Sequence, residues 1–141
     1  MLNAITHLNY LAVLVTAVAG FMLGWLWYSP ILFAKAWMAE MKITEATMKA
    51  AAETGMAKYL GKSFLFTLMS TFGLAALITA HASAGALRGA LFGAFAAVFV
   101  SAPRLLNTSV WENRSARLLA INVGHEFVLF TLQGAILGVW R

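Results

Sequence analysis

The sequence predicts an all-α membrane protein with four transmembrane helices, and its composition is the main reason. Of the 141 residues, 62% are hydrophobic and 11% are charged, and the mean hydropathy is +0.81. A soluble domain is ordinarily about 45–50% apolar and about 25% charged. This composition excludes a disordered chain, a nucleic-acid-binding domain and an ordinary cytosolic enzyme. Each span must satisfy its backbone groups internally within the bilayer, so we expect the spans to be helices.

Long stretches with few charges are the second observation, since a spanning helix needs about 20 residues. No Lys, Arg, Asp or Glu occurs from Met1 to Ala34, and we expect the first span at 8–28, ended by Pro30. A cleaved signal peptide is the rival interpretation, but no Lys or Arg precedes the apolar run. The other spans are expected at 63–80, 86–106 and 118–140. Pro103 should kink or stop the third span.

The distribution of basic residues is the third observation and predicts an orientation. Eight of the ten Lys and Arg residues fall on the side of the two long connections, 31–62 and 107–117. The positive-inside rule then places both connections in the cytoplasm and both termini outside. The whole of 1–141 reads as a single membrane domain.

The first connection has a helical pattern of its own. Thr44 can cap a helix that begins at Glu45, and Met48, Ala52 and Met56 follow one face. We expect one or two short amphipathic helices on the membrane surface, interrupted near Gly55. Two interpretations stay open, a Met-rich arm that binds a partner protein and a connector that rests on lipid.

The fourth span carries a polar stripe. Asn122, Glu126 and Gln133 are spaced by four and seven residues on one helix face, and His125 lies beside them. Glu126 is the only acidic residue inside an expected span, and an ionisable group there is a candidate functional site. It could relay protons or cations together with His125. Alternatively, it could join helices through polar partners, for which the second span offers Ser63, Thr67, Ser70 and Thr71.

Catalytic and metal-binding patterns are missing from the sequence. The chain has no Cys, which removes zinc–thiolate sites and thiol nucleophiles, and it has no Asp. No phosphate loop, nucleotide fingerprint or Ser–His–Asp set occurs. We therefore expect no catalytic residue, no metal, no cofactor and no enzymatic activity.

Glycines recur at four-residue spacing in three of the expected spans, which lets helix backbones approach closely in lipid. We expect some of these glycines to pack within the bundle and at least one set to support a homo-oligomer. The glycines are Gly20 and Gly24, then Gly85, Gly89 and Gly93, and finally Gly134 and Gly138.

The segment Trp27-Tyr28-Ser29-Pro30, followed by Trp37, resembles a bacterial membrane family catalogued as domain of unknown function 1761. The aromatic–acidic pair Trp111-Glu112 and the Gly-rich end at 134–138 extend this resemblance over nearly the whole chain. The resemblance implies a small multi-pass protein of the bacterial inner membrane. It brings no activity, substrate or catalytic residue with it.

Two functions follow from these features. The first is an oligomeric transporter or channel for a proton, a cation or a small solute, with the polar stripe along its path. The alternative is a non-catalytic scaffold or accessory subunit of a larger membrane complex. The expected partners are the lipid bilayer, further copies of the chain and another membrane protein; nucleic acid is excluded.

Overall fold

The computed structural model describes residues 5–53, 55–81 and 84–140, and these ranges contain helices and no strand. The predicted all-α class is therefore confirmed. The helices in chain order are α2 (Tyr10–Trp27), α3 (Ala34–Glu40), α4 (Glu45–Glu53), α5 (Met56–Ala80), α6 (Ala86–Ala96), the π-helical turn η1 (Ala97–Ser101), α7 (Ala102–Trp111) and α8 (Ala116–Val139).

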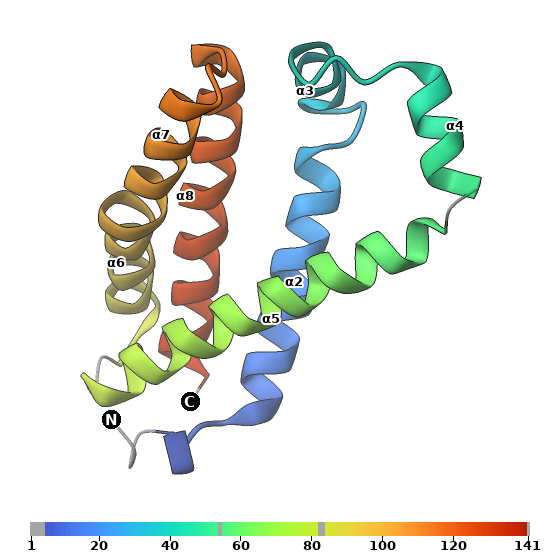
Figure 1. Cartoon of the computed structure of the whole chain (residues 1–141). Helices are drawn as coiled ribbons and strands as arrows, with labels where there is room; N and C mark the ends of the chain where they lie inside the picture. Colours follow the sequence, from blue (N-terminus) through green and yellow to red (C-terminus); the bar gives the residue numbers. More distant parts are fainter. Residues whose placement is uncertain (1–4, 54, 82–83, 141) are drawn as a thin grey trace.

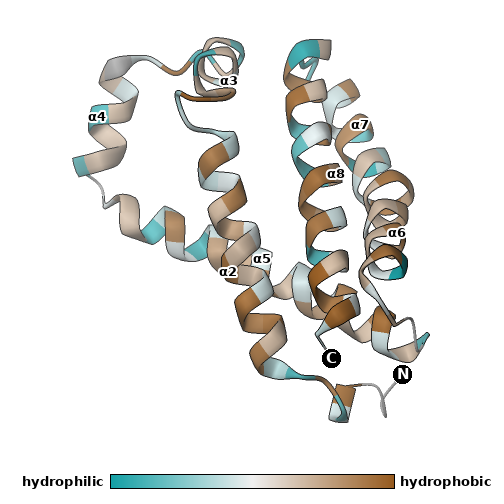
Figure 2. Cartoon of the chain, turned by 180° about the vertical axis from the view of Figure 1, so that it is seen from behind, coloured by the Kyte–Doolittle hydropathy of each residue, from teal (hydrophilic) through white to brown (hydrophobic). Residues whose placement is uncertain are grey.

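Four helices are long and apolar enough to cross a membrane: α2, α5, the continuous helix Ala86–Trp111 and α8. Many of their large apolar side chains face outward, and Trp25, Leu87 and Val100 are 73%, 73% and 68% exposed. Figure 2 shows hydrophobic residues along much of α2 and α8. Apolar surface of this extent is unfavourable in water and is covered in a bilayer. The chain is a helical-bundle membrane protein, as the sequence predicts.

The first span is bounded by a side-chain cap and a tight turn. Asn9 Oδ1 accepts a hydrogen bond from the backbone N–H of Ala12 at 3.0 Å, which satisfies one of the free donors at the start of α2. The helix ends at Trp27, three residues before Pro30. The carbonyl of Ser29 then accepts hydrogen bonds from the N–H groups of Leu32 and Ala34, each at 3.1 Å, and turns the chain into α3.

The long connection contains two short helices, α3 and α4, and α4 begins at Glu45 as expected. Gly55 follows with φ +100°, a conformation that suits glycine, and there the helical pattern is interrupted. The next helix, α5, starts at Met56, seven residues before the expected start of the second span. Lys58 and Lys62 therefore lie on α5 rather than on the connection, because nothing breaks the helix between Gly55 and Ala80.

Of the two effects expected of Pro103, a kink or a stop, the stop is wrong, and so is the expected end of the third span at residue 106. The helix continues for eight residues beyond Pro103 to Trp111, which shortens the expected connection 107–117 to a turn at 112–115. The chain accommodates the proline with the π-helical turn η1, in which the N–H of Ala102 reaches the carbonyl of Ala97. A wider turn of this kind relieves the clash that a proline ring makes with the preceding turn of an α-helix.

The helices form a bundle with one oblique member (Figure 1). The helix Ala86–Trp111 runs antiparallel to α8, while α5 crosses α2 and α8 at a steep angle. The turn after α2, helix α3 and the α7–α8 turn gather at one end, where Ser115 donates a hydrogen bond to Glu40 at 2.5 Å. We call this the connection end. The start of α2 and the end of α8 lie at the opposite end.

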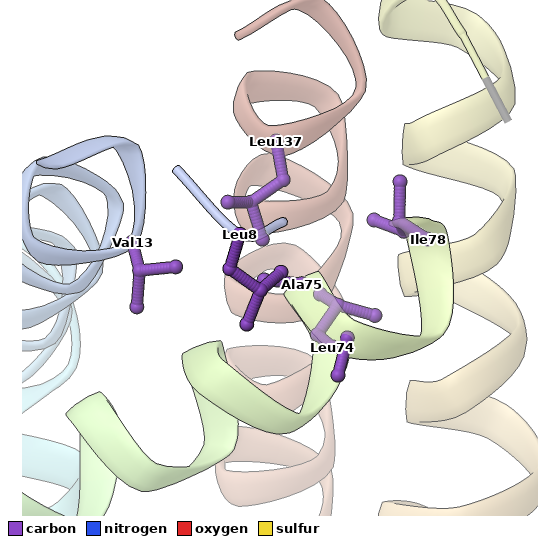
Figure 3. Packing of buried hydrophobic residues seen from close by; sticks show 7 residues of the cluster. Leu8, Val13, Leu74, Ala75, Ile78 and Leu137 are labelled. Atoms are coloured by element: carbon purple, nitrogen blue, oxygen red, sulfur yellow. The ribbon is translucent and has the colours of Figure 1, made fainter. Parts of the chain in front are cut away.

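A hydrophobic cluster lies at that opposite end (Figure 3). It joins the start of α2, the second half of α5 and the end of α8. Its buried members are Leu8, Val13, Leu74, Ala75, Ala76, Ile78 and Leu137. This apolar cluster closes the bundle on the side away from the connections.

Glycines bring α6 and α8 together backbone to backbone. A Cβ atom on Gly89 would lie 2.0 Å from the carbonyl oxygen of Gly134, and one on Gly93 would lie 1.9 Å from that of Phe130. The N–H of Gly85 also donates to the carbonyl of Gly138 at 2.7 Å. The glycines of the third and fourth spans therefore pack within the chain, and their spacing gives no support for self-association.

Candidate functional site: a polar cavity at the connection end

Glu126 of the polar stripe is held by a residue that the sequence did not single out. Ser101, the last residue of η1, donates its hydroxyl to Glu126 Oε2 at 2.7 Å. His125 Nδ1 lies 3.7 Å from Glu126 Oε1. The side chains of Glu126 and His125 keep 28% and 13% of their surface exposed. The bond from Ser101 is a contact between helices through a serine, as the structural alternative for Glu126 expected, but the serine lies on the third span and not on the second.

Asn122 lies one turn before Glu126 on α8 and binds the end of α2. Tyr28 donates its hydroxyl to Asn122 Oδ1 at 3.1 Å. The neighbouring Trp27 donates its indole N–H to the carbonyl of Ile121 at 3.2 Å. These two bonds fix the end of α2 against the first half of α8.

Aromatic rings surround this junction. The rings of Tyr28 and Trp37 lie 5.4 Å apart between centroids with an interplanar angle of 60°. Trp27 stacks in a tilted arrangement on Phe33 at 4.8 Å. The imidazole of His125 lies 5.2 Å from the ring of Tyr28 and 5.9 Å from that of Trp27. The Trp-Tyr segment and α3 thus build an aromatic wall beside the polar stripe.

A partly open cavity of about 490 Å³ lies between this wall and the third span. Its size falls in the usual range of small-molecule sites, about 300–1,000 Å³. The lining residues come from the end of α2, from α3, α7 and α8, and from the turns at the connection end. They are Tyr28, Trp37, Met41, Leu105, Thr108, Ser109, Glu112, Arg114, Leu118, Leu119, Asn122 and Glu126.

Charged residues of both signs lie at the cavity. Arg114 pairs with Glu112, and it also donates to the sulfur of Met41 at 2.8 Å. Glu40 accepts from Ser115 and lies 4.0 Å from Arg117. In the ranges that the structure describes, no group of three His, Asp or Glu side chains could hold a metal ion.

Gln133, the last residue of the polar stripe, lies apart from the cavity. It is fully buried, and its Nε2 donates to Thr71 Oγ1 at 2.7 Å. Its Oε1 has no partner among the described residues, and neither does the fully buried Oγ1 of Thr16 on α2. A Cβ on Gly20 would lie 2.7 Å from Gln133 Nε2, so this glycine makes room for the amide. Gly24 does the same for His125, whose Nε2 would lie 3.4 Å from such a Cβ.

The family model of the Protein of unknown function (DUF1761) matches residues 11–138. The chain belongs to this family. No curated protein and no solved structure matches the chain.

The residues that carry the family resemblance are divided between cavity and surface. Tyr28, Trp37 and Glu112 line the cavity, and Trp27 anchors the end of α2. Ser29 is buried, and its hydroxyl accepts from the N–H of Ile31 at 3.3 Å. Pro30 lies exposed in the same turn. Trp111, in contrast, is 82% exposed and lines no part of the cavity.

Proposed function

We propose that this DUF1761 protein is a small membrane transporter whose solute, proton or cation enters the cavity at the connection end. One observation carries the proposal: Glu126 lies within a membrane-spanning helix and yet lines a partly open cavity. A carboxyl group at such a depth is unfavourable unless it is paired or wet, and residues of this kind commonly mark ion and substrate pathways.

The polar groups below the cavity support a path rather than an isolated pocket. His125 lies beside Glu126, and the buried amide of Gln133 lies two turns further along α8. Beyond them the hydrophobic cluster around Leu8 and Leu137 closes the bundle. This arrangement corresponds to a state that is open to one side, and transport requires a second state in which the cluster parts.

The moving element in our proposal is the pair α2 and α5. The glycine contact holds α6 and α8 backbone to backbone, since added Cβ atoms would meet backbone atoms at 1.9–2.4 Å, and we therefore treat these two helices as the fixed part. The cluster on α2 and α5 consists of ordinary side chains, which can separate and repack. In our proposal the open end faces the cytoplasm, as the positive-inside rule predicts.

The proposal includes self-association and no catalytic reaction. The remaining support for an oligomer is the outward-facing apolar surface of the spans, which lipid or a second copy can cover. Native mass measurements in nanodiscs test it, and a monomer with full flux would remove the oligomer from the proposal.

Flux through proteoliposomes tests transport. Vesicles that hold a pH dye are given a membrane potential, and proton or cation flux is compared for the wild type, Glu126→Gln and Glu53→Gln. Glu53 is exposed on α4 and provides the same charge change outside the cavity. We expect Glu126→Gln to reduce flux at least tenfold and Glu53→Gln to leave it unchanged. Equal flux in all three, with folded protein, would exclude transport through Glu126.

A non-catalytic scaffold or accessory subunit is the second candidate, and α4 favours it. This helix lies outside the bundle, and Met48, Lys49 and Glu53 are exposed. A wild-type protein without flux of any proton, cation or tested solute would favour this candidate. If transport is correct, Met48→Ser on α4 leaves flux unchanged.

A further inference from the structure

The charges that line the cavity leave one carboxyl group without a strong cationic partner. Arg114 is engaged by Glu112 and by Met41. Glu126 is bound by the neutral hydroxyl of Ser101 and lies 3.7 Å from His125. In the described part of the chain, no Lys or Arg forms an ion pair with Glu126. The interior of the cavity therefore favours a positive charge.

The aromatic wall favours the same charge. Tyr28 and Trp37 both line the cavity, and the hydroxyl of Tyr28 is bound to Asn122. Aromatic faces attract cations electrostatically, and the attraction grows when water is excluded. Asn122 joins Tyr28 to the helix turn that carries Glu126, so the rings and the carboxyl group border one space.

The remaining lining selects among cations. Leu105, Leu118 and Leu119 contribute apolar surface, which suits organic groups and does not replace the water shell of a metal ion. An anion would meet the carboxyl group of Glu126, which pairs with no Lys or Arg among the described residues, while the guanidinium of Arg114 is already bound to Glu112. A like charge in such a site opposes binding.

We infer that the cavity binds a small organic monocation. The cation would lie with Tyr28 and Trp37 on one side and the carboxyl group of Glu126 on the other. The inference rests on the proposed function, since it names the class of solute that the transporter would carry. It adds Trp37 of α3 as a specificity residue. The polar stripe of α8 does not include this residue.

Binding to the full chain in mild detergent tests the inference without any transport step. The probes are tetraethylammonium, tetraphenylphosphonium and tetraphenylborate, the last of which has the shape of tetraphenylphosphonium with the opposite charge. We expect saturable binding of both cations and none of the borate. Glu126→Gln should weaken cation binding at least about tenfold, because the cation loses the attraction of the carboxylate charge. Glu53→Gln should leave it unchanged.

An aromatic pair of variants provides an independent measurement, even if Glu126→Gln fails to fold. Trp37→Leu keeps apolar bulk in the cavity but removes the ring face, and we expect about threefold to tenfold weaker cation binding. Trp25→Leu is the matched control, because Trp25 is 73% exposed and lines no part of the cavity. Circular dichroism and size-exclusion chromatography verify the fold of each variant.

Three outcomes would overturn the inference: no saturable binding of either cation, equal binding of tetraphenylphosphonium and tetraphenylborate, or cation binding that neither Glu126→Gln nor Trp37→Leu weakens. Failure of the proposed function is distinguishable from these. Tetraethylammonium that binds to the protein but does not cross proteoliposomes would exclude transport of such cations and retain the binding site. Flux of another solute without cation binding would support transport and exclude the cation site.

Discussion

Ser101 donates a hydrogen bond to Glu126 across 2.7 Å and thereby joins the π-helical turn of the third span to the polar stripe of the fourth. The bond gives one oxygen of a largely buried carboxyl group a partner from a neighbouring span. It also places the irregular turn next to the one acidic side chain inside a span.

Ser101→Ala should lower the free energy of unfolding by about 0.5–1.5 kcal/mol, because Glu126 loses its hydroxyl partner. Unfolding in mixed detergent micelles measures this. The matched control is Ser70→Ala, since Ser70 binds the carbonyl of Thr67 within its own helix. A larger loss for Ser70→Ala than for Ser101→Ala would contradict the importance of this contact between spans.

Gly89→Ala should destabilise the bundle by at least about 2 kcal/mol or prevent folding. The added Cβ would meet the backbone of Gly134, which cannot rotate away as a side chain can. Gly73→Ala on α5 is the control, because its Cβ would have nothing within 4 Å. Alanine there should be neutral or stabilise by up to about 1 kcal/mol through helix propensity. If the two variants lose the same free energy of unfolding, Gly89 is not required for the close contact of α6 and α8.

Thr71→Val should destabilise the protein more than Gln133→Met. Valine leaves the buried amide of Gln133 without its acceptor, and an unsatisfied buried group costs about 1–3 kcal/mol. Methionine removes the amide instead, while Thr71 keeps its bond to the carbonyl of Thr67 at 2.7 Å. Adding Gln133→Met to Thr71→Val should recover part of the stability. A double mutant that is merely additive would indicate that the two side chains do not interact.

Closing the hydrophobic cluster with a covalent link should stop flux without affecting the cavity. The chain has no cysteine, so Leu8→Cys with Leu137→Cys introduces the only reactive pair. We expect a bifunctional maleimide to abolish proteoliposome flux and to leave tetraphenylphosphonium binding intact. The single variant Leu8→Cys, treated in the same way, is the control. Undiminished flux through fully cross-linked protein would contradict an opening between α2 and α8.

Helical periodicity was sufficient to predict part of the candidate site. Asn122 and Glu126 are four residues apart, and the structure places both in the cavity wall. Gln133 lies on the same face of α8, but α5 crosses that face further along and Thr71 covers the amide. The steep tilt of α5 results from packing between helices, which periodicity within one helix does not contain.

The partner of Glu126 could not be predicted from the sequence, for a related reason. Regular spacing at 3.6 residues per turn assigns Ser101 a direction, but η1 adds a residue to one turn and changes that direction. Pro103 indicated a distortion without specifying its form. Similarly, the aromatic–acidic pair Trp111-Glu112 separates, because a turn begins directly after Trp111 and directs Glu112 to Arg114.

The π-helical turn has a consequence for how the chain tolerates changes in length. Deleting one residue from a regular helix rotates everything beyond the deletion by about 100°, which would turn the glycine face of α6 away from α8. Within 97–101 the helix already holds one residue more than an ordinary turn needs. Loss of Phe99, together with Pro103→Ala, would turn this segment into an ordinary α-helical turn. The side chains of α6 and α7 would then keep their present directions about the helix axis. The middle of the third span is therefore the place where this chain can lose a residue while the contact of α6 with α8 is kept.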